Sequence, residues 1–209
     1  MQSLALRRFL FAALSASPLM LLAATTLPAQ AARSLTFTFP RLSDGSVIPA
    51  GYGDIPNALS TEFSCEDGSR ARYWKDDYSD LDGVAYGCSS SSTEIVFKPE
   101  PGYSLKLLGL DFGAYSSDRD SKLRISEGST VLLEEDPMQA LISQRKSYDF
   151  DSISIAGGSE LAISWGPDSY NVGIDNIRFQ LIGVPAPLSL AGALGAFHWS
   201  RRLRSRTRL

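Results

Sequence analysis

The strongest constraint on the fold is a series of short segments in which apolar and polar residues alternate, punctuated by glycine, proline, aspartate and serine. In the segment 34–40, SLTFTFP, Leu35, Phe37 and Phe39 alternate with polar residues, as in a strand with one buried face. In the second half of the chain such segments recur about every ten residues, a rhythm typical of a β-sandwich or barrel. Further strands are expected at 93–99, 104–113, 121–127, 130–136, 152–157, 161–166 and 172–183.

The sequence therefore predicts an all-β body over residues 33–183. About 150 residues suffice for one core between two sheets. No helical stripe of useful length interrupts the pattern, although the tract Met138–Lys146 could form one short helix.

The first 31 residues of the chain have the features of a secretory signal peptide. Arg7 and Arg8 precede a largely apolar run, and Ala29 and Ala31 have the spacing of an Ala-x-Ala cleavage site. We expect cleavage to leave a mature chain that begins near Ala32 or Arg33. The alternative is an uncleaved membrane anchor.

Charge is distributed unevenly along the chain. All 23 aspartates and glutamates lie in the body, together with only 13 of the 20 lysines and arginines, so the body carries a net charge of −10. Such a body is poorly suited to bind nucleic acid, which requires cationic side chains against phosphate. It is compatible with a cation, a neutral glycan or simple solubility.

Cys65 and Cys88 are the only cysteines. An even pair in an exported body predicts one disulfide. Metal binding is a poor alternative, because zinc requires four ligands and no histidine lies near. The two cysteines bracket residues 64–92, which are rich in Asp, Gly, Ser and Tyr and are expected to form a long surface excursion.

Aromatic residues in this excursion are candidates for ligand binding. Sugar rings stack their apolar faces on aromatic planes, and Tyr73, Trp74 and Tyr78 could supply such planes. The alternative is that Trp74 folds back and plugs one end of the sandwich. Trp165, at the end of an alternating strand, is expected in the core.

The single histidine, His198, lies outside the body. The body therefore has no Ser-His-Asp triad and no histidine metal ligand, and we predict that it is not an enzyme. Paired carboxylates acting on an extracellular polysaccharide remain the enzymatic alternative.

Structural calcium is the candidate cofactor, because it takes oxygen ligands from carboxylates and backbone carbonyls. Asp54 and Asp175 each lie in a tight turn or strand next to glycine, near the first and the last expected strand. These strands often lie side by side in a sandwich, so the two carboxylates could meet. The alternative is that both only cap turns.

Residues 184–209 combine a Val-Pro-Ala-Pro corner, a short apolar run and an arginine-rich end. As a helix the apolar run spans roughly 20 Å, short of a bilayer core of about 30 Å. The arginines belong on the cytoplasmic side. This arrangement predicts a transient anchor at the inner membrane, with a processing site at the extended proline segment.

The tail resembles the PEP-CTERM sorting signal of exosortase substrates, in the variant with alanine between the prolines. The resemblance rests on Val184, Pro185, Ala186 and Pro187, the apolar run, and Arg201 and Arg202. Within the body, 48–54 and 173–179 resemble elements of PEP-CTERM proteins that have jelly-roll, galactose-binding-like domains.

The resemblance implies export, removal of the tail by exosortase, and a final place at the cell surface or in the exopolysaccharide matrix. The expected role is that of a non-enzymatic module that binds carbohydrate or is purely structural.

Overall fold

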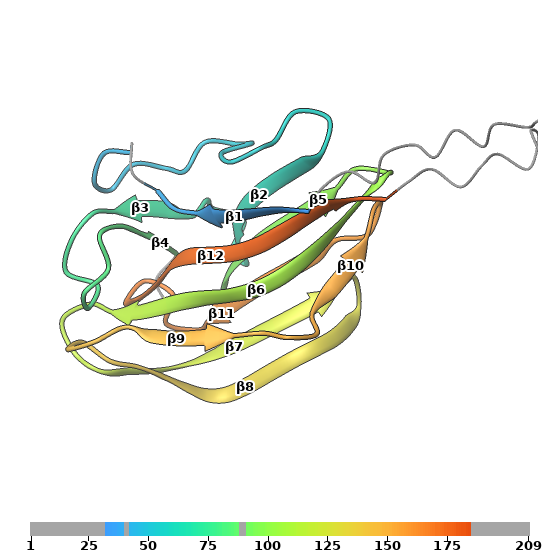
Figure 1. Ribbon diagram of the computed structural model, residues 1–209. Coiled ribbons are helices and arrows are strands. Elements are labelled where there is room, and N and C mark those ends of the chain that lie inside the picture. Colours follow the sequence, from blue (N-terminus) through green and yellow to red (C-terminus); the bar gives the residue numbers. More distant parts are fainter. Residues whose placement is uncertain (1–31, 40–41, 88–90, 185–209) are drawn as a thin grey trace, which may run out of the picture.

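A computed structural model describes residues 32–39, 42–87 and 91–184. Within these ranges it contains strands and no helix, which confirms the all-β prediction (Figure 1). No helix in the described part of the chain is long and apolar enough to cross a membrane. The strands are β1 (Arg33–Phe37), β2 (Leu59–Cys65), β3 (Arg72–Trp74), β4 (Val84–Tyr86), β5 (Thr93–Pro99), β6 (Tyr103–Ala114), β7 (Arg119–Glu127), β8 (Thr130–Ala140), β9 (Lys146–Asp149), β10 (Ser154–Ala156), β11 (Leu161–Gly166) and β12 (Val172–Gly183).

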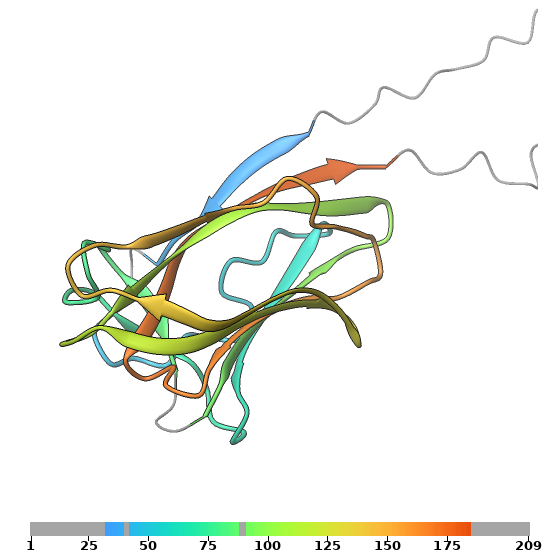
Figure 2. The ribbon, with the colours of Figure 1, turned by 90° about the horizontal axis from the view of Figure 1, so that it is seen from below.

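The strands form two antiparallel sheets that pack as the layers of a β-sandwich (Figure 2). Sheet A has the order β10-β6-β12-β4-β3, with β1 also paired to β12 and β9 to β6. Sheet B has the order β2-β5-β11-β7-β8. The first and last strands lie side by side, as expected, with Phe37 opposite Ile177.

One hydrophobic core fills the space between the sheets. Sheet A contributes alternate residues of β6 and β12, including Phe112 and Phe179, and sheet B contributes residues such as Phe97 and Trp165. Trp165 is only 1% exposed, and its indole N–H donates to the carbonyl of Val172 at 2.8 Å. The hydrogen bond satisfies the polar atom of an otherwise apolar side chain, so the prediction that Trp165 is a core residue is confirmed.

The prediction of a short helix at Met138–Lys146 is wrong. Strand β8 continues to Ala140, and residues 141–145 form an irregular connection to β9. Met138 and Ala140 are buried while Gln139 between them is exposed. This period of two is that of a strand, and a few residues were too short a window to distinguish it from a helical turn.

The excursion between the cysteines is more structured than expected. It forms β3 and β4, which extend sheet A beside β12, and the segment between these two strands, around Tyr78, crosses the outer face of that sheet. Gly113 and Gly173 allow this close approach, because a Cβ atom on either would overlap Tyr78 or Val84. Part of the excursion thus packs on the outer face of sheet A.

Candidate functional site

Tyr78, Tyr86 and Trp74 of the excursion form a small second core on the outside of sheet A, whereas Tyr73 belongs to the main core between the sheets. Tyr73 is 2% exposed and Tyr78 is 3% exposed, and the Tyr78 hydroxyl donates to the carbonyl of Tyr170 at 2.5 Å. Their ring faces are therefore not accessible to a sugar. The expectation that Tyr73 and Tyr78 present stacking surfaces is corrected by this burial, which a polar loop sequence did not reveal.

Trp74 is half-buried in the same cluster. Its ring meets the rings of Tyr86 and Tyr115 edge-on, at centroid separations of 6.2 and 6.4 Å. The structure therefore places Trp74 as a plug against the outer face of sheet A. In this cluster Tyr170 is the most exposed ring, at 47%.

The structure places Asp54 and Asp175 in different surroundings. Asp54 accepts hydrogen bonds from the amide and hydroxyl of Thr61, at 2.6 and 3.0 Å, whereas Asp175 lines a pocket on sheet A. Among the described residues no group of three or more Asp, Glu, His or Cys side chains is arranged to hold a metal ion. Calcium binding by this pair remains a prediction without structural support.

Asp175 is a buried carboxylate on β12, only 5% exposed. Its Oδ1 has no hydrogen-bond partner. Burial raises the pKa of Asp175 to about 7, and the nearby carboxylate of Asp111 adds to the shift. A β-bulge between Asp175 and Arg178, with Asn176 at a φ of 49°, changes the direction of the side chains at this point of the strand.

Next to Asp175 lies a network of ion pairs centred on Asp111 of β6. The Asp111 carboxylate accepts from Arg178 at 3.1 Å and from the Asn176 amide at 2.9 Å, and Arg145 lies 3.5 Å away. Arg178 also contacts Asp149, and Arg145 also contacts Asp80. Both guanidinium groups are therefore already paired with carboxylates.

The predicted disulfide involves one cysteine that lies outside the described residues. Cys65 ends β2 and is buried beside Thr93, whereas Cys88 lies outside the described ranges. The pairing of the two cysteines stays a prediction.

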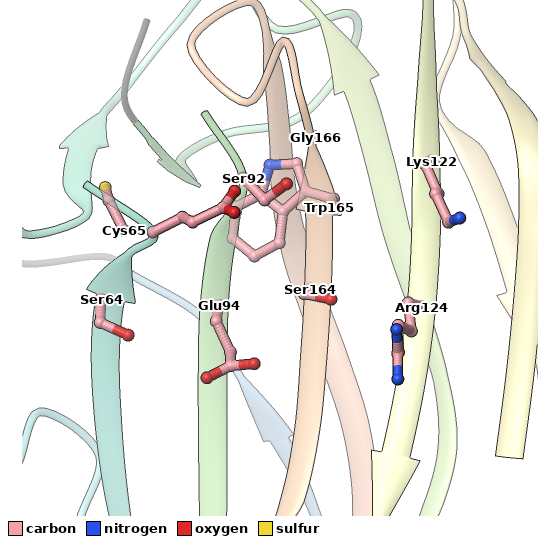
Figure 3. A pocket seen from close by; sticks show the side chains of 10 residues that line it. Ser64, Cys65, Ser92, Glu94, Lys122, Arg124, Ser164, Trp165 and Gly166 are labelled. Atoms are coloured by element: carbon pink, nitrogen blue, oxygen red, sulfur yellow. The ribbon is translucent and has the colours of Figure 1, made fainter. Parts of the chain in front are cut away.

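A polar groove crosses the outer face of sheet B and has a volume of about 380 Å³. Strand pairing places Ser64, Glu94, Ser164 and Arg124 in one row across β2, β5, β11 and β7, and their side chains point away from the core (Figure 3). The remaining lining residues are Cys65, Glu66, Ser92, Lys122, Trp165 and Gly166.

No hydrogen bond or ion pair joins the four described side chains of this row, although the charge of Arg124 favours the ionised form of Glu94. Within the described ranges, none of the four makes a side-chain hydrogen bond or ion pair. Lys122, at the far wall, pairs with Glu134 at 2.9 Å. Burial raises the pKa of Glu94 above its usual range, and the charges of Glu160 and Glu62 contribute in the same direction. The groove thus offers unused donors and acceptors in a partly desolvated setting.

Sequence reasoning missed the groove. Each of its residues is an ordinary polar position in an alternating strand, and four strands distant in sequence contribute to it. The alternation in each strand indicates which polar side chains point outward. Which of them lie side by side depends on the register between strands, which the sequence does not show.

The sorting motif lies at and beyond the end of the described chain. Val184 donates its amide hydrogen to the carbonyl of Gly102 at 2.7 Å. Pro185, Ala186, Pro187, Arg201 and Arg202 lie outside the described residues.

No protein-family model matches this chain, and no curated protein matches it. Several solved structures are similar at low identity. The Podospora anserina GH26-CBM35 β-(1,4)-mannanase has 12% identity and a TM-score of 0.33, with 63% of this chain covered and 29% of that chain.

TmCBM61 in complex with β-1,4-galactotriose has 12% identity and a TM-score of 0.33, with coverage of 59% and 88%. The family 11 carbohydrate-binding module from Clostridium thermocellum, in complex with a β-1,3-1,4-mixed-linked tetrasaccharide, has 12% identity and a TM-score of 0.29, with coverage of 68% and 98%. The chain spans less than a third of the length of the mannanase structure that it matches. Likeness at this level assigns neither a family nor a ligand.

Proposed function

We propose that this protein is a non-enzymatic module that binds a glycan along the polar groove of sheet B. The observation that carries the proposal is the row of Ser64, Glu94, Ser164 and Arg124, whose side chains are aligned and make no hydrogen bond to other described residues. Polar groups that converge in a groove without partners suit a ligand that supplies both donors and acceptors.

The charge of the groove favours a neutral, polyhydroxylated ligand. The groove is lined by two acidic residues, Glu66 and Glu94, and two basic residues, Arg124 and Lys122, of which Lys122 is also paired with Glu134. Sugar hydroxyls can donate to the carboxylates and accept from the guanidinium, and such charge-assisted hydrogen bonds are the stronger ones. A groove that spans four strands suits an extended chain of sugar units.

A glycan array probed with the full-length protein, followed by titration of the best glycan, tests this proposal. Loss of a charged hydrogen-bonding group costs about 1.5–3 kcal/mol, so Glu94→Gln and Arg124→Ala should each weaken binding by roughly tenfold or more.

Two exposed positions outside the groove provide matched controls. Glu100→Gln and Arg70→Ala remove the same kinds of charge elsewhere and should leave the affinity unchanged. Equal affinity in all four variants, or no selective glycan on the array, would contradict binding in the groove.

An enzyme acting on extracellular polysaccharide is the second candidate. The groove contains two carboxylates, Glu66 and Glu94, and the raised pKa of Glu94 would suit a general acid. Release of new reducing ends from a bound polysaccharide, abolished by Glu94→Gln, would favour this candidate. Binding without any product would leave the non-enzymatic module.

Export and sorting form a separate part of the proposal, supported by both ends of the sequence. We infer that residues 1–31 direct export and that the tail holds the protein at the inner membrane until exosortase removes it near Pro185–Pro187. The mature protein would then reside at the cell surface or in the matrix. Mass spectrometry of protein recovered from an exosortase-bearing host should show both ends missing, and an intact tail would contradict the processing step.

A further inference from the structure

A second pocket, distant from the groove, lies on the outer face of sheet A. It has a volume of about 300 Å³ and lies between the excursion and the bulge of β12. Asp175 and Asn176 come from the bulge, Asp80 and Asp82 from the excursion, and Arg145 from the connection before β9.

Among the described residues, the charges around this pocket are not balanced. Arg145 and Arg178 are both occupied by Asp80, Asp111 and Asp149. Asp82 and Asp175 have no ion pair in the described part of the chain. The surroundings therefore contain five carboxylates and two guanidinium groups.

Asp175 is the carboxylate that a cation in this pocket would contact. Its Oδ1 is buried and has no partner, although it lines an open pocket. The charge of Arg145 and the backbone amide of Asn176 favour the ionised form of Asp175, but burial outweighs them. A buried carboxylate that is only partly compensated is unfavourable, and a positively charged group placed in the pocket would reduce that cost. The Asn176 amide nitrogen is used by Asp111, so the amide oxygen of Asn176 is available to the same group.

We propose that this pocket binds a cationic group through Asp175, and that the group is the ammonium of a small amine-bearing molecule such as an amino sugar. The volume favours an organic molecule over a metal ion, since it corresponds to about ten water molecules at about 30 Å³ each. The pocket also offers the amide oxygen of Asn176 to a hydroxyl group. The proposal is independent of glycan binding in the groove.

NMR titration of the full-length protein with glucosamine and with N-acetylglucosamine tests the proposal, because acetylation replaces the cationic ammonium by a larger, neutral amide on the same sugar ring. We expect glucosamine to bind at least roughly tenfold more tightly, which corresponds to about 1.4 kcal/mol. The difference should disappear in Asp175→Asn and diminish in Asp82→Asn. It should persist in Asp151→Asn, an exposed carboxylate elsewhere, and in the groove variant Arg124→Ala.

Calcium chloride alone is the second arm of the experiment. Calcium binding that is lost in Asp175→Asn, without glucosamine binding, would keep a cation site but overturn the assignment to an organic ammonium. If neither probe binds, or if binding is the same in Asp175→Asn, the site itself is refuted. Failure of Arg124→Ala to affect a groove glycan would count only against the groove.

Discussion

At the scale of single residues, Asp175 combines burial with a missing partner. Its pKa is about 7 in the folded protein, against an ordinary aspartate value of about 3.9 in the unfolded chain. Between these values the folded state holds a proton that the unfolded state has lost. The contribution of Asp175 therefore becomes more destabilising as the pH rises from about 4 to about 7.

The variant Asp175→Asn should remove this dependence. It should have the stability of the wild type near pH 4 and exceed it at pH 8 by up to about 4 kcal/mol, since each pKa unit is worth about 1.4 kcal/mol. Urea unfolding at both pH values, in buffer free of amines and divalent ions, measures the difference. Asp151→Asn is the exposed control, and a gain that is equal at both pH values would show that titration of Asp175 is not the cause.

Arg178 connects three strands of sheet A through hydrogen bonds to several residues. It reaches Asp111, Asp149 and the carbonyl of Tyr148, and so joins β12 to β6 and β9. Each of these residues is an unremarkable polar position in the sequence. Their association follows from the bulge in β12, which brings Arg178 over Asp111.

At the scale of elements, the contact between the excursion and sheet A depends on residues without side chains. Gly113 of β6 lies directly under the backbone of Tyr78. The amide of Ser79 donates to the carbonyl of Ala114 at 3.1 Å, and the Ser79 hydroxyl contacts the carbonyl of Leu141. The excursion is therefore held close to the strand by backbone hydrogen bonds.

Gly113→Ala should lift the excursion from sheet A. The new Cβ would overlap the Tyr78 carbonyl oxygen, and overpacking of this kind typically costs about 1–3 kcal/mol. Hydrogen exchange should show faster exchange in residues 76–82 while the core of sheet B stays protected. Ser104→Ala in the same strand is the control. Unchanged exchange in Gly113→Ala would mean that the excursion is not held by this contact.

At the scale of the whole molecule, one core connects both sheets, so the body should unfold as a unit. A disulfide between Cys65 and Cys88 would restrict the unfolded chain and contribute roughly 3 kcal/mol. Reduction should then lower the melting temperature by about 10 °C. The double variant Cys65→Ser, Cys88→Ser should melt at the lower temperature with or without reductant. Two free thiols in the mature exported protein would refute the disulfide.

The sequence by itself determined the class of the fold. Alternation of apolar and polar residues identified the long strands β1, β5, β6, β7, β8, β11 and β12, because a half-buried strand exposes every second side chain to water. It also identified Trp165 as a core residue and the first and last strands as neighbours. The strands β2, β3, β4 and β9 were not predicted; β3 and β4 have three residues each, too few to show a period, whereas β10 fell within the strand expected at 152–157.

Only the tertiary structure decided which polar residues are used and which are free. Of the excursion aromatics considered for sugar stacking, Tyr73 joined the main core, whereas Trp74 and Tyr78 pack in a second core on the outside of sheet A. Asp54 found a partner in Thr61, while the Oδ1 atom of Asp175 has no hydrogen-bond partner among the described residues. The groove of sheet B arose from the register of four strands. Local periodicity indicates which face of a strand a residue occupies. Which residues meet on that face depends on the pairing of strands that are distant in the sequence.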